Sequence, residues 1–275
     1  MKKSTLVVLF LVAFTGCQTS NQTVDYSNNT LYSTLWVQTA AEYEALTYQA
    51  YNTAESLLPV AVEDSSWTAS LEQEDPYFDK PPAIILDLDE TAIDNSFYEA
   101  RAILDKSGFD AETWNNWVRE AEAEAIKGAV ELTNYANELG IEIFYITNRD
   151  AEVQSYTVQN LVELGFPVEE GSVMSNGGRP GWTSAKTERR KLVTESYRVL
   201  MLFGDDLNDF VPARGISIKE RKALAEQYSD HWGVRWFVLP NPNYGSWERA
   251  LYSGDEQSEE EMQQSRLNLL KDKRN

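Results

Sequence analysis

Two aspartates follow a short apolar run in the first half of the chain. Residues 83–86 are apolar, two prolines precede them, and Asp87 and Asp89 come soon after. The run is too short for a buried helix, so we predict a buried strand of a parallel sheet. Side chains two positions apart on a strand lie on the same face, which lets both carboxylates face one crevice. Two carboxylates that close raise each other's proton affinity unless a cation lies between them, so the pair predicts a bound Mg²⁺.

The chain around this run alternates between strand and helix patterns. The patterns after the first strand are, in order, a helix over 131–139, a strand over 141–146, a helix over 151–164, a strand over 199–203 and a strand over 234–239. This order indicates an α/β domain with a mostly parallel central sheet and flanking helices. We expect the domain to span residues 30–253, with a small helical accessory region inserted at about 92–128.

Polar residues lie at the ends of three of these strands. Asp87 and Asp89 follow the first strand, Thr147 follows the second, and Asp205 and Asp209 follow the third. In open α/β sheets the ligand binds beyond the carboxyl ends of the strands, where such side chains meet. Turn-forming acids would explain one strand end of this kind easily, but three only poorly. The pattern therefore predicts one polar site at this edge of the sheet.

Charge and composition exclude several classes of function. The 275 residues carry a formal net charge of −20. Such a field repels nucleic acid and anionic lipid, although a small phosphate can still enter a locally basic pocket. The single cysteine, Cys17, permits neither an internal disulfide nor a cysteine-based zinc site. The single histidine, His231, excludes mechanisms and metal sites that need two.

The first residues have the pattern of an export signal. Two lysines precede an apolar core over 6–14 that is too short to span a bilayer. The segment 14–17 resembles the lipobox of bacterial lipoproteins, although Phe14 stands where Leu is usual. We therefore predict a lipoprotein signal peptide at 1–16, a lipid anchor at Cys17 and a flexible tether over 17–29. A plain secretory signal with an incidental cysteine is the alternative. The lipobox predicts attachment to the bacterial outer membrane or cell surface, with the periplasmic side as another location.

Helical patterns also lie outside the sheet. Residues 30–56 repeat apolar positions at steps of three and four, which predicts one helix that packs on the domain. In the accessory region, Asp110 is a predicted helix cap, and Trp114 and Trp117 follow on one stripe. For Trp117 we expect a core position. The tail over 254–275 begins acidic and ends basic, which favours a helix through its dipole.

The motifs together resemble those of a known superfamily. Residues 87–91, Thr147, Lys186 and residues 204–209 look like the four motifs of the haloacid dehalogenase superfamily of phosphohydrolases. Longer stretches resemble the bacterial class C acid phosphatases, also known as lipoprotein 5′-nucleotidases, and these are residues 87–96, 147–149, 204–210 and 240–247. The resemblance runs from about residue 36 to residue 252, and the lipobox agrees with it. It implies a Rossmann-like haloacid dehalogenase fold.

The resemblance also implies a mechanism. Asp87 would be the nucleophile and a ligand of Mg²⁺, together with the backbone carbonyl of Asp89 and the carboxylate of Asp205. The Asp89 carboxyl would act first as general acid and then as base. Thr147 would donate a hydrogen bond to the phosphoryl group, and Lys186 would offset its negative charge.

Residues near the motifs are expected to support the site. Asp94 and Asn95 would hold the loop over the metal, with ordinary turn chemistry as the alternative. Asp209 would orient either metal-bound water or Lys186. The family more often has Asn at the position of Asp206, so this chain carries an extra carboxylate there. Asn148 and Arg149 are also expected to support the site. The sequence favours neither of two alternatives for Arg149, Arg189 and Arg190. They steer phosphate, or they are charges on the surface.

Aromatic residues could select the substrate. The resemblance implies nucleoside monophosphates whose base is held by stacking. Trp114 and Tyr244 occupy the matching positions, with core packing as the alternative for both. Tyr98 and Trp247 are weaker candidates. Because stacking tolerates many bases, we expect broad specificity.

Two functions remain to be compared. One is a Mg²⁺-dependent phosphomonoesterase, a phosphoric monoester hydrolase acting as acid phosphatase or 5′-nucleotidase. The other is a non-catalytic surface lipoprotein that uses the same fold for binding or storage. The presence of both Asp87 and Asp89 favours the enzyme. The sequence leaves the oligomeric state open, a homodimer included.

Overall fold

The computed structural model describes residues 30–252 and 258–273. The predicted signal peptide, the lipid anchor at Cys17 and the tether over 17–29 lie outside the described residues. The described chain forms a five-stranded parallel sheet with the strand order β5-β4-β1-β6-β7. Its strands are β1 (Pro82–Leu86), β4 (Glu142–Asp150), β5 (Val173–Asn176), β6 (Arg198–Gly204) and β7 (Trp236–Val238). The predicted α/β class with a mostly parallel sheet is confirmed.

The central strand β1 is apolar because both of its faces are buried. Ile84 and Leu86 pack into the core on one face of the sheet, and Ala83 and Ile85 pack into the core on the other. Alternating side chains on a strand point to opposite faces, so a strand covered on both sides needs apolar residues throughout. Since β4 and β6 pair with β1 on either side, the residues at the carboxyl ends of these three strands lie close together.

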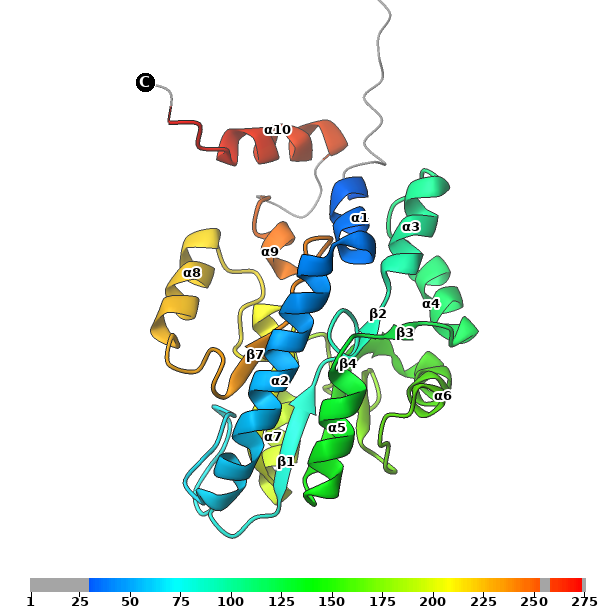
Figure 1. The fold of residues 1–275 in the computed structure, drawn as a ribbon. Helices are drawn as coiled ribbons and strands as arrows, with labels where there is room; N and C mark the ends of the chain where they lie inside the picture. The colour runs from blue at the N-terminus through cyan, green and yellow to red at the C-terminus, as the bar shows by residue number, and fades with distance from the viewer. Residues whose placement is uncertain (1–29, 253–257, 274–275) are drawn as a thin grey trace, which may run out of the picture.

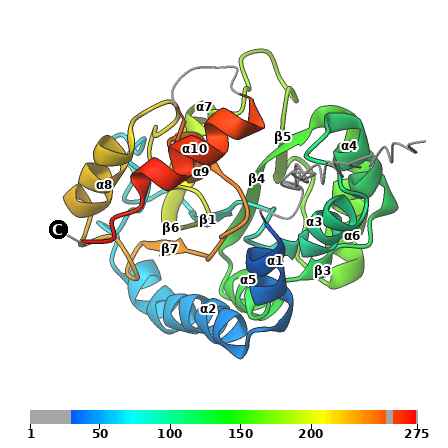
Figure 2. The same cartoon turned by 90° about the horizontal axis from the view of Figure 1, so that it is seen from above.

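Helices cover both faces of the sheet (Figures 1 and 2). On one face lie α2 (Ala41–Glu63) and α5 (Ala129–Glu138), and on the other lies α7 (Thr187–Ser196). Further helices are α6 (Gln154–Leu164), which follows the 3-10 helix η2 (Ala151–Val153), and α8 (Ile218–Gln227) beside β7. The sheet edge that carries the polar strand ends is therefore supported by helices on both faces.

The structure differs from the sequence prediction at β5. The sequence patterns predict no strand between residues 164 and 199, but Val173–Asn176 pairs with β4 as the edge strand of the sheet. The strand was missed because only its first two residues are apolar and it ends in a turn. The sheet consequently has one strand more than predicted.

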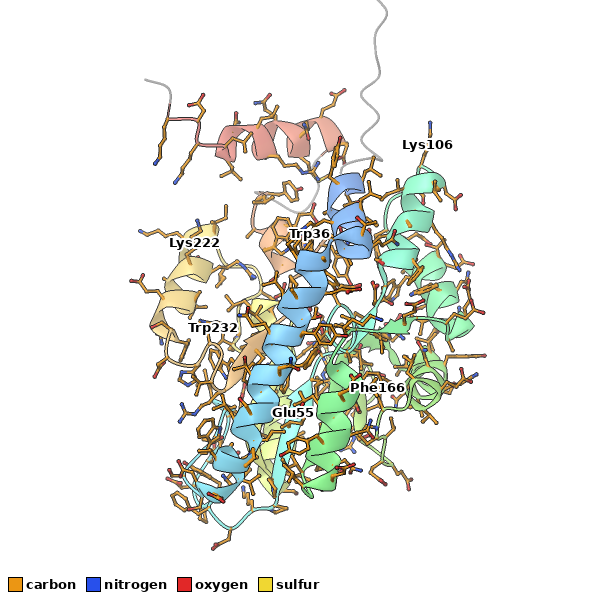
Figure 3. The ribbon with its side chains drawn as sticks, viewed as in Figure 1. Trp36, Glu55, Lys106, Phe166, Lys222 and Trp232 are labelled. Carbon is orange, nitrogen blue, oxygen red and sulfur yellow. The ribbon has the colours of Figure 1, made fainter. Side chains whose placement is uncertain are left out.

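The predicted N-terminal helix is two helices. The first, α1, spans Leu31–Thr39, and α2 begins at Ala41, because Ala40 has an extended backbone between them. Trp36, labelled in Figure 3, lies at this break. It packs edge-on against Tyr43, with 5.5 Å between the ring centroids. The second helix also continues beyond the predicted end and contains Pro59. The break brings α1 to the end of the molecule where the strands carry their carboxyl termini (Figure 1).

The accessory region contains a small sheet as well as helices. Strands β2 (Ile93–Asp94) and β3 (Glu124–Ala125) pair antiparallel and frame α3 (Ser96–Leu104) and α4 (Ala111–Glu120). The mixture of helix and loop predicted here omitted the two strands, since strands of two residues leave no periodicity. Asp110 caps α4 as predicted, because its carboxylate accepts hydrogen bonds from the backbone N–H groups of Glu112 and Thr113.

The C-terminal helix lies beyond the carboxyl ends of the strands. It is α10 (Glu259–Leu269), which lies over the short helix α9 (Ser246–Arg249) (Figures 1 and 2). Arg266 joins the two by donating to Tyr252 and by an ion pair of 3.3 Å with Glu248. Among the helices of the described residues, none has both the length and the apolar character that a membrane span requires.

Candidate active site

Asp87 lies immediately beyond β1, at the centre of the sheet edge. Its backbone N–H donates to the carbonyl of Phe203 on β6 over 3.0 Å, which fixes the backbone as the strand ends. Its carboxylate oxygen Oδ1 is 2.5 Å from Nζ of Lys186, the residue that precedes α7. The next residue, Leu88, is fully buried in the core, as the alternation predicts.

Asp87 belongs to a cluster of three carboxylates. Oxygen atoms of Asp87, Asp205 and Asp209 lie within 4.8 Å of one another. Lys186 is 2.6 Å from Oδ1 of Asp209 as well as in contact with Asp87. The cluster thus combines three carboxyl groups with one ammonium group. When all three are ionised, the excess is two negative charges, which a divalent cation would neutralise.

Burial changes the proton affinity of these groups. Burial, with the nearby Asp209 and Asp89, raises the pKa of Asp87 from 3.8 to about 7, although Lys186 opposes the shift. Burial and the charges of Asp209 and Asp87 raise the pKa of Asp205 well above its usual value. Burial lowers the proton affinity of Lys186, but the two carboxylates outweigh burial and its pKa is raised. The lysine is therefore a permanent cation in the site.

A glycine makes room for the third carboxylate. A Cβ placed on Gly204, the last residue of β6, would overlap the carboxylate and Cβ of Asp209. Asp209 ends the 3-10 helix η3 (Leu207–Asp209), which turns back over the strand. The close approach of η3 to β6 is possible because residue 204 has no side chain.

Asp89 is held by a different set of groups. Its Oδ1 accepts hydrogen bonds of 2.9 Å from Nε of Arg149 and from Nδ2 of Asn95. A second guanidinium nitrogen of Arg149 also lies 2.9 Å from Oδ1. Oδ2 accepts from the hydroxyl of Thr147 over 3.3 Å. The Arg149 side chain is 1% exposed and that of Asp89 is 15% exposed, so the arginine side of this ion pair is shielded from water.

Asn95 connects this ion pair to the accessory region. Its Oδ1 accepts from Nε1 of Trp117 at 2.8 Å and from Arg149 at 3.1 Å. Its backbone N–H donates to Oε1 of Glu90 over 2.9 Å. Asp94 accepts from the backbone N–H of Ser96 and so shapes the same loop. Burial, followed by nearby acids, raises the pKa of Glu90 well above its usual value.

Asp206 faces away from the carboxylate cluster. It caps η3 and accepts hydrogen bonds from the backbone N–H and the hydroxyl of Ser246, at 2.6 Å each. Burial raises its proton affinity, but the hydrogen bonds from Asn208 and Ser246 outweigh burial and its pKa is lowered. Oδ2 of the neighbouring Asp205 accepts from Nδ2 of Asn241 over 2.7 Å. The extra carboxylate of this chain is therefore part of a turn that joins η3 to α9.

The three arginines left open by the sequence are all buried. Arg149 pairs with Asp89. Arg189 donates to the carbonyls of Thr147 and Met174 and to Oδ1 of Asn148, so it braces the ends of β4 and β5. Arg190 forms a 2.6 Å ion pair with Glu72. The surface location is excluded for all three.

The four predicted substrate aromatics lie in two groups. Tyr98 and Trp114 pack edge to face in the accessory region, 5.1 Å apart, and the guanidinium of Arg149 is 5.8 Å from the Trp114 ring. Trp114 is partly exposed, whereas Tyr98 is 5% exposed and bonds to Thr113. Tyr244 and Trp247 lie together after β7, joined by a hydrogen bond from Trp247 Nε1 to the Tyr244 carbonyl. The buried hydroxyl of Tyr244 has no hydrogen-bond partner among the described residues.

Sequence reasoning missed three residues of the site. Trp117 is a core residue as expected, at 4% exposure, but it also donates to Asn95. By sequence alone, Glu90 is one position of a motif and Asn241 one position of a resemblance, and neither is predicted to contact the site. For Glu90 the signal was a carboxylate inside a stretch that is otherwise buried, while a lone tryptophan on a helical stripe carries no signal of a polar contact.

Fold and site together define a class of protein. A parallel α/β sheet that carries an aspartate pair after its central strand, a threonine on the next strand and acids after the third has the arrangement of a haloacid dehalogenase (HAD) phosphatase. A family model for the HAD superfamily, subfamily IIIB (acid phosphatase) matches residues 12–247. The chain therefore belongs to this family of phosphoric monoester hydrolases, which confirms the resemblance seen in the motifs.

Relatives and solved structures agree with the family. The chain is 29% identical to acid phosphatase 1 of Solanum lycopersicum over 163 residues, which are 58% of this chain and 57% of that protein. It is 25% identical to the stem 28 kDa glycoprotein of Glycine max over 165 residues, 58% of each. The match thus spans little more than half the length of these relatives. The class C acid phosphatase from Bacillus anthracis superposes with a TM-score of 0.81 at 34% identity, over 90% of this chain and 99% of that one. Its structure with tungstate bound gives the same score at 33% identity.

Proposed function

We propose that the chain is a Mg²⁺-dependent phosphomonoesterase, an acid phosphatase or 5′-nucleotidase, that works through a phosphorylated Asp87. The observation that supports this most strongly is the carboxylate cluster at the centre of the sheet edge. Asp87, Asp205 and Asp209 surround one lysine there, while Asp89 is bound separately by Arg149. Two aspartates two positions apart thus have different charged neighbours, as two different roles would require.

The donor set fits a hard divalent cation. Carboxylate oxygens are preferred ligands of Mg²⁺, and the excess negative charge of the cluster equals the charge of one such ion. Asp87 and Asp205 would bind it with their carboxylates and Asp89 with its backbone carbonyl. Asp209 is held by Lys186 and would orient water in the ion's coordination sphere. When bound, the cation screens the Asp87 carboxylate from the negative charge of a phosphate ester.

The residues of the chain then divide the reaction between them. A carboxylate oxygen of Asp87 attacks phosphorus, and the bond from phosphorus to the ester oxygen breaks. The Asp89 carboxyl gives its proton to the departing oxygen, and the resulting carboxylate later takes a proton from the water that attacks the phosphorylated Asp87. Lys186 offsets negative charge on the phosphoryl group, and Thr147 donates a hydrogen bond to it. Inorganic phosphate and free Asp87 are the products of the second step.

Nucleoside monophosphates are the substrate class we propose. Trp114 is partly exposed beside the Arg149 ion pair, and Tyr244 lies after β7, on the Asp205 side of the site. A ring at either place would hold a base by stacking. A Trp114→Ala variant should lose more activity on a nucleotide than on p-nitrophenyl phosphate. Equal losses on both would reject the stacking role.

Secretion and anchoring complete the proposal. A lipid at Cys17 would hold the enzyme at a bacterial outer membrane or cell surface, where it could release nucleosides from nucleotides that cells do not import. Incorporation of labelled fatty acid into the wild type but not into a Cys17→Ser variant is the expected result. Label in both, or in neither, would reject the anchor without touching the catalytic proposal.

The test of the catalytic proposal compares wild type with Asp87→Asn on p-nitrophenyl phosphate, with Mg²⁺ and with EDTA. We expect Asp87→Asn to lose at least about 10³-fold in kcat, as nucleophile removal does in other covalent mechanisms. EDTA should abolish wild-type turnover, and added Mg²⁺ should restore it. An Asp230→Asn variant removes a remote acid and serves as the matched control. Retained turnover in EDTA, or in Asp87→Asn, would reject the mechanism.

Binding or storage without catalysis is not favoured, because both aspartates and the cluster are present.

A further inference from the structure

We propose that Trp117, acting through Asn95, is a positioning residue for proton transfer by Asp89. The inference rests on the proposed function, because it assigns the geometry of the general acid. Trp117 lies on α4 in the accessory region, where packing alone would accept other large apolar residues. Its indole N–H, however, donates to Oδ1 of Asn95 over 2.8 Å.

The two oxygens of Asp89 have unequal surroundings. Oδ1 faces N–H donors of Asn95 and Arg149, all at 2.9 Å. A proton on that oxygen would point at these donors. Among the described side chains, Oδ2 receives a hydrogen bond only from Thr147, at 3.3 Å. Oδ2 is therefore the oxygen that carries the proton to the leaving group, and its direction depends on how firmly Oδ1 is held.

The orientation of the Asn95 side-chain amide decides how Oδ1 of Asp89 is held. Trp117 Nε1 can only donate, and the guanidinium of Arg149 can only donate, so both need the amide oxygen of Asn95 on their side. With the oxygen fixed there, Nδ2 must face Asp89. A flipped amide would place its oxygen against the Asp89 carboxylate and leave the Trp117 N–H without an acceptor. Trp117 is 4% exposed, so water cannot readily replace Asn95 as its partner.

Three further contacts keep this arrangement rigid. The Trp117 ring packs against Phe97 of α3. The guanidinium of Arg101, also on α3, lies 4.9 Å from the centroid of the Trp117 ring. The backbone N–H of Asn95 is anchored by Glu90. Asn95 is thus fixed through its side chain by α4 and through its backbone by the loop after Asp89. The accessory region consequently contributes to the geometry of the proton donor and not only to the shape of the entrance.

The experiment exploits the chemistry of the leaving group. A phenolate such as p-nitrophenolate departs without protonation, whereas an alkoxide needs a proton from the general acid. The value of kcat/KM is therefore compared for p-nitrophenyl phosphate and β-glycerophosphate. We expect Trp117→Phe to lower kcat/KM about tenfold on the alkyl ester, part of the 10²-fold or more that a general acid supplies, and far less on the aryl ester. A loss caused by general disruption would be the same for both.

A matched tryptophan provides the control. Trp67 is also buried, at 8% exposure, and its Nε1 donates to the Leu200 carbonyl over 2.8 Å at a distance from the site. Trp67→Phe loses an equivalent hydrogen bond and should leave the ratio of the two kcat/KM values unchanged. Equal losses on both esters in Trp117→Phe, or no loss on either, would overturn the proposal. Should Trp117→Phe not fold, Asn95→Leu is measured in the same way with the same two outcomes.

Variants of the two proposed catalytic aspartates separate this inference from the proposed function. Asp89→Asn must itself lose more on the alkyl ester than on the aryl ester, or Asp89 is not the general acid. Asp87→Asn must abolish both activities, or the mechanism itself is wrong. If both behave as expected and Trp117→Phe shows no selectivity, only the positioning role of Trp117 fails.

Discussion

Asp87 and Asp89 are the same residue type two positions apart, but their surroundings differ in charge balance. Asp87 shares its pocket with two more carboxylates and one lysine. Asp89 is paired with one arginine and held by the amide of Asn95. When its carboxyl groups are all ionised, the first group carries an excess of negative charge, whereas the second is neutral as a pair. The chain itself supplies the counterion of the second group, whereas in the proposed function a cation from solution offsets the charge of the first group.

This difference shows how one short motif can supply two roles. Buried like charges are unfavourable unless a counterion is present, so the Asp87 cluster costs stability that a bound cation would restore. The Asp89 ion pair depends instead on direction, because a planar guanidinium and an amide must meet one oxygen. Substitutions in the Asp87 cluster should therefore change activity through charge and metal binding. Substitutions around the Asp89 ion pair should change it through geometry.

Among changes that leave Asp87 and Asp89 in place, the largest effect is expected where the cluster loses its shape. Gly204→Ala would force Asp209 away from Lys186 and from the other carboxylates. We expect about a 10²-fold loss of kcat, because misplacement of about 1 Å can have that effect, together with a higher Mg²⁺ requirement in a titration of activity. Gly108→Ala is the control, since a Cβ there meets no atom within 4 Å. Full activity of Gly204→Ala would show that Asp209 is not needed in its observed place.

Arg149→Lys tests whether charge or geometry matters on the Asp89 side. Lysine keeps the positive charge but cannot contact both Asp89 and Asn95 as the guanidinium does. We expect kcat to fall about tenfold with little change in the Mg²⁺ requirement, as steady-state kinetics would show. Arg119→Lys alters an exposed ion pair with Glu152 and should have no effect. Wild-type kinetics in Arg149→Lys would mean that charge alone is sufficient.

Stability without metal should depend on pH because of Asp87. Burial raises its pKa from 3.8 to about 7, so the folded state binds this proton more tightly than the unfolded chain does. The resulting stability is fully present below pH 3.8 and is lost as pH rises through about 7. In EDTA, the Tm of the wild type should fall across this window relative to that of Asp87→Asn, by several degrees. Mg²⁺ should reduce the difference at neutral pH. Parallel Tm profiles for the two proteins in EDTA would contradict the raised pKa.

The smallest effect on activity is expected at Asp206. Its carboxylate joins η3 to Ser246 and lies 3.8 Å from Arg221, outside the cluster. Asp206→Asn removes a charge but keeps one acceptor, so we expect kcat within about twofold of wild type and a stability loss of about 1 kcal/mol. Urea denaturation and kinetics on p-nitrophenyl phosphate would measure both. A large loss of kcat would place Asp206 among the metal-binding groups after all.

Much of the fold and of the central site could be predicted from the sequence. Strands buried on both faces leave continuous apolar runs, so β1, β4 and β6 were found with the polar residues at their ends. The short strands β2, β3 and β5 were missed because two to four residues carry little periodicity. The break at Ala40 was missed because alanine favours helix and no local signal marks its extended backbone.

Other features depend on contacts between distant segments. Arg149 could have been a surface charge or a phosphate ligand by sequence, and only the folded chain brings it onto Asp89. Trp117 and Asn95 are 22 positions apart, so their hydrogen bond has no local pattern. Asp206 differs from Asp205 only in the direction of its side chain, which the turn into η3 sets.

The sequence by itself determined which chemical groups stand at the ends of the strands, because the order of apolar runs and polar residues is a local property. It also determined the net charge and the single cysteine and histidine, and with these the classes of function that are excluded. The tertiary structure alone decided which acids share a pocket and which one pairs with an arginine. Pairing of buried charges depends on distance in space, and that distance follows from the packing of the whole chain.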